Sequence, residues 1–133
     1  MRKKKTSRQK MYAKLDKLAS EIVRKRGRCV LCNKQFDPKK LNAHHWIVTK
    51  GHSTKYRWDL RNLVALCYPC HIHKIHSTAS LKYLEILKKN AIAYGICSQK
   101  DVDEISGNYE VADFSMEDLE NIFEKLKQEA SNG

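Results

Sequence analysis

The sequence predicts one mostly helical α+β domain, in which two short strands and a helix form a small core between flanking N- and C-terminal helices. Three observations lead to this fold class. The chain shows helical periodicity near both ends, it has two β-rich runs at 41–48 and 60–66, and two Cys-x-x-Cys pairs enclose these runs. A chain of 133 residues with 41% hydrophobic residues can bury a core of its own.

The N-terminal part of the chain is basic and then helical. Residues 1–10 are predicted to be a disordered basic arm. Residues 11–28 form the next unit, with a helix at about 11–26, because apolar residues recur there at helical spacing and Gly27 follows as a stop. The apolar positions are Met11, Tyr12, Leu15, Leu18, Ala19, Ile22 and Val23.

Residues 29–79 are expected to form the central unit. The run 41–48 has the β-branched and aromatic content of a strand, and 60–66 is a second short apolar run. Residues 49–58 are predicted to be a loop, because they contain Gly, Ser and Thr without periodicity. A cysteine-bearing turn then leads into "HIHKIH", so the expected order is strand, loop, strand and helix.

Residues 80–133 are predicted to form a helical extension with an acidic bias. We assign this extension to packing or partner contact. Helices are expected over about 80–93, 99–105 and 114–130. Ser115 and Asp118 resemble a capping box at the last of these. The candidate N-caps of the first are Ser77, Thr78 and Ser80, and its expected inner residues are Leu81, Leu84, Leu87 and Ile92.

The net charge of +11 is unevenly distributed. Residues 1–40 contain 15 Lys or Arg against 3 Asp or Glu, residues 41–100 contain 9 against 2, and residues 101–133 contain 2 against 10. A bias of this size predicts a polyanionic partner, and nucleic acid is the common one. A solvated basic surface and an anionic membrane surface are the alternatives.

The expected location is cytoplasmic. No apolar stretch follows the basic start, as a secretory signal would require, and no run is long enough to span a bilayer, so no membrane partner is expected. Thiols stay reduced in the cytoplasm. The five cysteines therefore favour a metal site or catalysis over disulfides.

Cys29-x-x-Cys32 and Cys67-x-x-Cys70 are two identical pairs separated by 34 residues. The two-residue spacer lets both thiolates of a pair reach one ion at about 2.3 Å, and two pairs complete a closed tetrahedral zinc site. Such a structural zinc could contribute on the order of 10 kcal/mol to folding. The alternative is ordinary buried cysteines or a redox pair. Cys97 has no such partner and is expected in the core.

The six histidines follow the two cysteine pairs as His44, His45 and His52, and then His71, His73 and His76. On a strand, His44 and His45 point to opposite faces, so one can hold a metal while the other addresses something else. Phosphodiester hydrolysis needs a base that takes a proton from water, and imidazole titrates near neutral pH. It also needs a cation that neutralises the charge developing on the phosphate. Asn62 can orient the base through its amide. Each histidine by itself would be a surface or core residue, but the joint arrangement favours a hydrolase.

The segments "CVLC", "AHHWIV" and "RNLVALCYPCHIHK", in this order, resemble the His-Asn-His (HNH) endonuclease superfamily. The core of that superfamily is a ββα-metal motif of two strands and a helix around one metal, and the match covers about residues 29–75. The resemblance implies that His45 is the general base and that Asn62 holds it in position.

The same resemblance implies a catalytic divalent cation bound by His44 and His71, with His73 as the substitute for His71. Many superfamily members have an acidic residue where this chain has His44. Two imidazoles without a carboxylate suit manganese, nickel, cobalt or zinc better than magnesium, although phosphate oxygens and water can complete a magnesium shell.

A narrower similarity, to the NinG (Rap) family of phage recombination endonucleases, extends over "CVLCNK", "AHHW", "YRWDLRN", "CHIHK", "VDEI" and the charged C-terminal helix. That family is thought to cut branched DNA such as Holliday junctions. The resemblance therefore implies a phage protein that acts on junction DNA in the host cell. The family pattern has Asp at the position of Asn42 and Gly at that of His44, and its last histidine falls closer to His73 than to His71.

Two further readings remain open beside a junction nuclease. One is a restriction, homing or packaging-type HNH nuclease acting on duplex DNA, and the other is a zinc-dependent nucleic-acid-binding module without catalysis. Two symmetric cuts in a junction would favour a homodimer, with the C-terminal helix as the interface.

Basic residues near the proposed centre and in the N-terminal arm are the expected DNA contacts. They are Arg57, Arg61, Lys74, Lys3, Lys4 and Lys5. Trp46, Tyr56 and Trp58 could stack on unpaired bases or belong to the core. No segment has the character of a helix that reads base edges, so selectivity for DNA shape is expected.

Overall fold

The computed structural model describes residues 4–49, 54–77 and 80–132. Its architecture is mixed α+β and mostly helical, as predicted. The helical elements are α1 (Ser7–Lys25), the short 3-10 turns η1 (Pro38–Lys40) and η2 (Leu60–Asn62), the π-helix η3 (Cys70–Ile75), α2 (Ser80–Ala93), α3 (Gln99–Ile105) and α4 (Met116–Asn132). The strands are β1 (Leu41–His45) and β2 (Leu63–Cys67).

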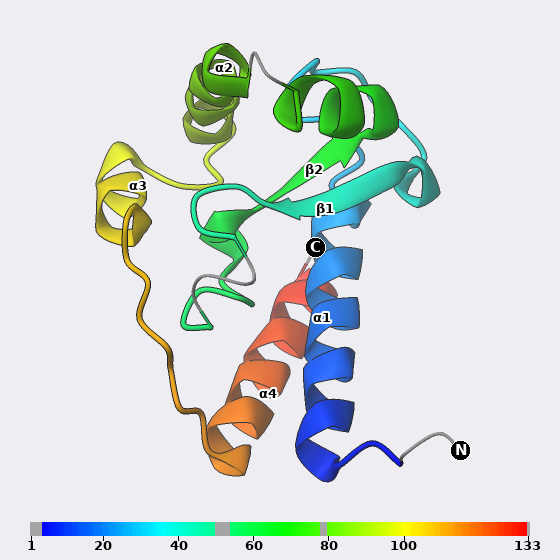
Figure 1. Ribbon diagram of the computed structural model, residues 1–133. Coiled ribbons are helices and arrows are strands. Elements are labelled where there is room, and N and C mark those ends of the chain that lie inside the picture. The colour runs from blue at the N-terminus through cyan, green and yellow to red at the C-terminus, as the bar shows by residue number, and fades with distance from the viewer. Residues whose placement is uncertain (1–3, 50–53, 78–79, 133) are drawn as a thin grey trace.

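A two-stranded sheet lies at the centre of the molecule. Figure 1 shows α1 and α4 side by side below the sheet, η3 and α2 above it, and α3 beside it. The first and last helices of the chain therefore meet on one side, although almost the whole sequence separates them. Within the described residues, no helix is both long and apolar enough to cross a membrane.

Helix α1 begins at Ser7, earlier than the sequence predicted, because Thr6 caps its first turn. The Thr6 hydroxyl accepts a hydrogen bond from the backbone N–H of Gln9 at 3.1 Å, and the Gln9 side chain accepts one from the backbone N–H of Thr6 at 2.9 Å. The prediction of a disordered arm is therefore wrong for residues 7–10. The other end agrees with the prediction, since Gly27 follows the helix with a positive φ of 74°.

Strands β1 and β2 pair antiparallel, with Leu41 opposite Cys67 and His45 opposite Leu63. Every residue of β2 is buried, because helices cover both faces of the sheet. The second apolar run starts later as a strand than predicted, since its first residues form η2. In this register the end of β2, at Cys67, lies opposite the start of β1, at Leu41.

Strand β1 ends at His45 and does not continue to residue 48 as predicted. The backbone N–H of Trp46 donates to the carbonyl of Asn62 at 3.0 Å, and those of Ile47 and Val48 both donate to the Asn62 side-chain oxygen at 2.9 Å. These bonds replace the strand ladder, so the chain turns away from the sheet directly after the histidine doublet.

Helices α2 and α3 lie where the sequence predicted them, and α4 begins and ends two residues later than predicted. Ser115 and Asp118 form the expected capping box, with hydrogen bonds of 2.9 and 3.0 Å between the backbone N–H of each and the side chain of the other. Leu87 of α2 is buried, as expected, but Leu81 is 80% exposed and does not belong to the inner face. Thr78, a candidate cap, lies outside the described residues.

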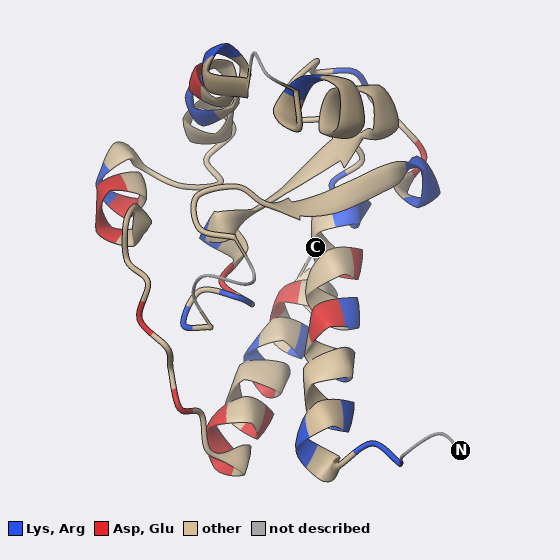
Figure 2. Ribbon diagram, viewed as in Figure 1, with Lys and Arg blue, Asp and Glu red and all other residues tan. Residues whose placement is uncertain are grey.

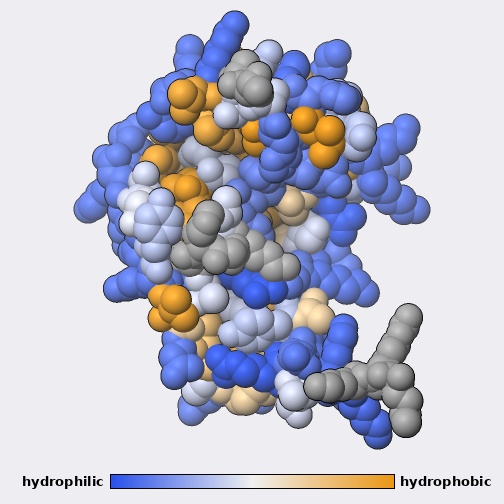
Figure 3. Space-filling view, viewed as in Figure 1, coloured by the Kyte–Doolittle hydropathy of each residue, from blue (hydrophilic) through white to orange (hydrophobic). Residues whose placement is uncertain are grey.

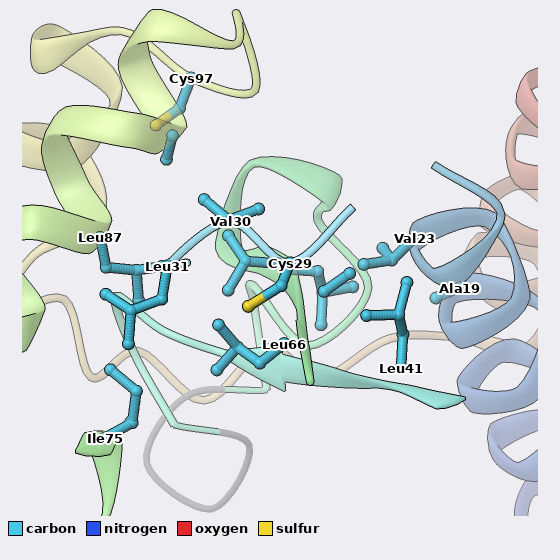
Figure 4. Packing of buried hydrophobic residues seen from close by; sticks show 14 of the residues in the cluster. Ala19, Val23, Cys29, Val30, Leu31, Leu41, Leu66, Ile75, Leu87 and Cys97 are labelled. Atoms are coloured by element: carbon cyan, nitrogen blue, oxygen red, sulfur yellow. The ribbon is translucent and has the colours of Figure 1, made fainter. Parts of the chain in front are cut away.

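One hydrophobic core joins the sheet to the surrounding helices. It takes residues from α1, β1, β2, α2, α3 and α4, and Leu15, Val64, Leu87 and Leu119 are fully buried in it. Figure 4 shows Cys29 at the centre of this packing, between Leu66 of the sheet and the neighbouring apolar side chains. The surface in Figure 3 is mainly hydrophilic, with small separate apolar patches.

We expect Leu119→Ala to lower the free energy of unfolding by about 2–5 kcal/mol, because it opens a cavity between α4 and α1. The matched control is Leu81→Ala, whose side chain is mostly in solvent, and which should change stability by less than about 0.5 kcal/mol. Denaturant unfolding followed by circular dichroism measures both values. Equal losses in the two variants would contradict the packing of α4 described above.

Candidate metal centres

The four cysteines of the two Cys-x-x-Cys pairs lie together. Their sulfur atoms are all within 4.8 Å of one another, and the sulfurs of Cys32 and Cys67 are 3.9 Å apart. Two sulfurs bound at about 2.3 Å to a tetrahedral ion would be roughly 3.8 Å apart. Three of the four cysteines are buried, and all five in the chain are free thiols. The cluster could therefore bind a structural metal such as zinc.

A tight turn presents the first cysteine pair. Arg28 and Gln35 form an antiparallel bridge at its base, and the backbone N–H of Cys29 donates to the carbonyl of Lys34 at 3.0 Å. Asn33 closes the turn in the left-handed conformation, with φ of 66°. Asparagine is among the few non-glycine residues that adopt this conformation readily. "CVLCNK" thus contains both the sulfur atoms and the residue that folds the chain around them.

Helix α2 supports the outer side of this turn. The side-chain amide of Asn90 donates to the carbonyl of Val30 at 2.8 Å and to that of Leu31 at 3.3 Å. The Tyr94 hydroxyl donates to the Asn33 side chain, next to the second cysteine of the pair. The carbonyl groups between Cys29 and Cys32 are therefore satisfied by Asn90, which holds the turn against α2.

Backbone N–H groups surround the sulfur of Cys29. Burial raises the pKa of this thiol, but N–H groups of Cys32, Cys67 and Leu31 donate to the sulfur and together hold its pKa below the ordinary value. Burial, together with the neighbouring cysteines, raises the pKa of Cys70. Such N–H donors stabilise thiolate, which is the form that binds a metal. Cys97 is buried outside this group, as expected.

A second group of possible ligands consists of His44, His71 and His76. Ring nitrogens of the three lie within 4.8 Å of one another, and Nε2 of His71 is 3.1 Å from Nε2 of His76. The His44 ring centroid is 5.1 Å from that of His71 and 5.5 Å from that of His76. Two nitrogens bound to one tetrahedral ion would be roughly 3.3 Å apart, so these residues fit a metal ion.

The π-helical geometry of η3 explains why His76 belongs to this group and His73 does not. The backbone N–H of His76 donates to the carbonyl of His71, five residues earlier, which is the π-helical pattern. Side chains five residues apart are therefore stacked on one face, whereas in an α-helix they would diverge. His73 instead packs edge-on against Tyr68, with ring centroids 5.9 Å apart. His73 is therefore not part of the group that the structure brings together, whereas His71 is.

The histidine group is more open than the cysteine group. His44 and His71 are half-buried, and His76 is exposed. Burial, with the charges of His71, His76 and His45, lowers the pKa of His44 to about 4, and burial with His76 also lowers the pKa of His71. Both imidazoles are neutral near pH 7, which is the form that binds a metal. Three protein ligands at the surface would leave coordination positions for water or substrate.

His45, the residue after His44 on β1, lies outside the histidine group. Its Nε2 lies 2.7 Å from the carbonyl oxygen of Arg57. Because a carbonyl oxygen only accepts, Nε2 carries the proton, and Nδ1 is then the basic nitrogen of the neutral ring. The charge of His45 also influences His44, so the two rings are electrostatically coupled.

The hydrogen bonds of the Asn62 amide go to the backbone and not to the ring of His45, which the sequence expected this amide to orient. The Asn62 side chain is buried and makes four hydrogen bonds with the backbone of the loop. The oxygen accepts from Ile47 and Val48, and the amide nitrogen donates to the carbonyls of Val48 at 2.8 Å and Tyr56 at 3.3 Å. Asn62 therefore fixes both ends of the loop whose Arg57 carbonyl holds His45.

The two arginines expected to contact DNA are engaged within the protein. Arg57 forms a bidentate ion pair with Asp16, with distances of 3.0 and 2.7 Å. Arg61 pairs with Asp59 at 2.6 Å and with Asp101 at 2.9 Å. These guanidinium groups hold the loop and α3 in place, so they are poorly available to a phosphate in this arrangement.

The lysines differ from these arginines. Lys4 and Lys5 are exposed before α1, whereas Lys3 lies outside the described residues. Lys74 is half-buried, with its amino group 5.7 Å from the ring centre of Tyr83. Figure 2 shows Lys and Arg residues on α1 and the segment before it, while Asp and Glu residues gather on α3, the segment leading to α4, and α4 itself.

Tyr56 and Trp58 are buried, with 3% and 5% of their surfaces exposed. Trp46 is partly buried, and its indole N–H donates to the carbonyl of Arg61 at 3.0 Å. Of the two roles that the sequence left open for these aromatic residues, base stacking and core packing, the structure favours core packing.

Loss of His76 should weaken metal binding at the histidine group. We expect His76→Ala to reduce the affinity of the zinc-loaded protein for Ni²⁺ by roughly tenfold or more, because one of three ligands is removed. His73→Ala, on the same helical segment, should leave the affinity within about twofold. Isothermal titration calorimetry measures both. Equal effects of the two substitutions would exclude the ligand set described here.

Comparisons with protein-family models, with curated proteins and with solved structures find no significant match for this chain.

Proposed function

We propose that this protein is a metal-dependent DNA endonuclease of the HNH type, which hydrolyses phosphodiester bonds. One observation carries the proposal: His44 belongs to an open group of three histidines, and the residue after it on β1, His45, has its protonated Nε2 bound to the carbonyl of Arg57. A metal site and a base with a defined tautomer are the two components that metal-assisted hydrolysis needs.

The cysteine group is proposed to hold a structural zinc. It has four thiol ligands and is mostly buried, which leaves no position for a substrate. The histidine group is proposed to hold the catalytic cation. This ion would polarise the scissile phosphate and neutralise the charge on the leaving oxygen. Three imidazoles without a carboxylate favour manganese, nickel, cobalt or zinc over magnesium.

The roles of the chain's own residues follow from their hydrogen bonds. Nδ1 of His45 accepts a proton from the attacking water, because the bond from Nε2 to Arg57 keeps the other nitrogen protonated. Asn62 acts indirectly, by fixing the loop that contains Arg57. His44, His71 and His76 would hold the cation, which would supply charge neutralisation at the reacting phosphate.

The proposed substrate is DNA, and within this class branched or junction DNA. The net charge of +11 favours a polyanion, and Lys10, Lys14 and Lys17 form an exposed basic stripe along α1. The preference for branched DNA, the role in phage recombination and the homodimer rest on the resemblance of the sequence segments alone. A nuclease acting on duplex DNA is the alternative with the same chemistry.

We expect Cys67→Ser to lose zinc and unfold. Zinc binding worth on the order of 10 kcal/mol is comparable to the whole stability of a domain. The control Cys97→Ser alters a thiol that is also buried but lies outside the cluster, so it should keep zinc and fold. Metal analysis by mass spectrometry and far-ultraviolet circular dichroism test this. A folded, zinc-free Cys67→Ser protein would be inconsistent with a structural zinc.

The nuclease proposal is tested by incubating the protein with linear duplex, single-stranded, flap and four-way-junction DNA, in magnesium and then in manganese. We expect His45→Ala to reduce the cleavage rate at least about 100-fold, because a general base is lost. DNA binding and zinc content should remain nearly unchanged.

His73→Ala is the matched control for this experiment, because His73 is an exposed histidine outside the ligand group. It should cleave at the wild-type rate. Cleavage by His45→Ala at that same rate would refute the assignment of the base. DNA binding by the wild type without cleavage of any substrate would instead favour a zinc-dependent binding module.

A further inference from the structure

The carbonyl that holds His45 belongs to a peptide group clamped from both sides. This peptide joins Arg57 to Trp58, and the side chains of both residues donate to one carboxylate, that of Asp16. Arg57 makes two bonds, of 3.0 and 2.7 Å, and the indole N–H of Trp58 makes a third, of 2.9 Å. A peptide group flanked by two anchored side chains has little freedom to rotate.

The clamp reaches the site from another part of the fold. Asp16 lies on α1, whereas His45 ends β1 and Arg57 lies in the loop that returns to β2. Tyr12, one turn before Asp16, adds to the anchor, because the Arg57 guanidinium lies 5.0 Å from its ring centre and the Trp58 ring packs edge-on against it at 4.9 Å.

The burial of the clamp strengthens it. The Arg57 side chain is 17% exposed and that of Asp16 is 30% exposed, so the ion pair is shielded from much of the solvent. Bidentate pairing also fixes the orientation of the guanidinium plane, which a single contact would not do. Without this clamp, the loop would be held here only by the bond from Asn62 to the Tyr56 carbonyl, and the Arg57 carbonyl would be less constrained.

We propose that Asp16 is a positioning residue for His45. By holding Arg57 and Trp58 it orients the Arg57 carbonyl, and this carbonyl fixes the tautomer and direction of the imidazole. The inference rests on the proposed function for its catalytic consequence. The effect of Asp16 on the tautomer of His45 does not depend on that function.

The first test is nuclear magnetic resonance of the zinc-loaded protein labelled with ¹⁵N-histidine, at one neutral pH. In the wild type, His45 should be mainly the Nε2–H tautomer. Asp16→Asn removes the charge and one arm of the bidentate pair with little change in shape, and should shift His45 toward a mixture of tautomers. An unchanged His45 spectrum in Asp16→Asn would overturn the proposal.

Asp101→Asn is the matched control. Asp101 also pairs with an arginine, at 2.9 Å, and its side chain is 27% exposed, but its partner is Arg61 and not the loop residue that holds His45. This variant should keep the wild-type His45 spectrum. An identical shift in both variants would point to a general loss of structure and would also overturn the proposal.

The second test is kinetic. In Asp16→Asn, kcat for DNA cleavage should fall roughly tenfold or more while KM stays within about twofold, because the base is misdirected but DNA contacts remain. Asp101→Asn should keep kcat within about twofold of the wild type. A wild-type kcat in a folded Asp16→Asn protein would overturn the catalytic consequence.

Two milder variants keep the test usable if Asp16→Asn does not fold. Trp58→Phe removes only the indole donor, and Arg57→Lys keeps the charge but loses the bidentate geometry. Each should shift the His45 tautomer in the same direction, and the absence of a shift in both would overturn the proposal. A tautomer shift in a protein that cleaves no DNA would support the positioning role and refute the nuclease proposal.

Discussion

The sulfur cluster is the constraint on which the rest of the centre depends. It joins the turn at residues 29–32 to the junction between β2 and η3, which are distant in sequence. Cys67 is the last residue of β2 and Cys70 is the first of η3, so His71 follows an anchored position directly. An ion bound there would fix the start of η3 relative to the sheet, and β1 pairs with that same sheet.

Two separate features of the fold place the adjacent residues His44 and His45 in different surroundings. The ring of His44 lies beside that of His71 on η3, whereas Nε2 of His45 meets the Arg57 carbonyl of the returning loop. Beyond the strand, buried polar contacts take over. Asn62 and Asp16 anchor the returning loop from two sides, one from within the loop and one from α1. The proposed base and the proposed metal ligand beside it are therefore held by different parts of the fold, although His44 and His45 are neighbours in the sequence.

Much of the fold could be predicted because its signals are local. The cysteine spacing, the periodicity of α1 and α4, and the Ser115–Asp118 capping box each depend on residues close in sequence, and the structure agrees with them. The prediction differs from the structure at the ends of two elements. Thr6 and Gln9 cap α1 before its apolar stripe begins, and the hydrogen bonds of the Asn62 side chain end β1 at His45.

By itself, the sequence predicted the group of four cysteines and the pairing of His44 with His71, because cysteine and histidine spacing is a local signal. Only the tertiary structure decided that His76, and not His73, lies beside His44 and His71, since a π-helical segment changes which side chains share a face. It likewise decided that Arg57 and Arg61 pair with carboxylates from α1 and α3, because such ion pairs join positions whose proximity no local spacing reveals. Spacing along the chain indicates which side chains are able to bind a metal or form an ion pair. Long-range packing decides which of these side chains lie close together.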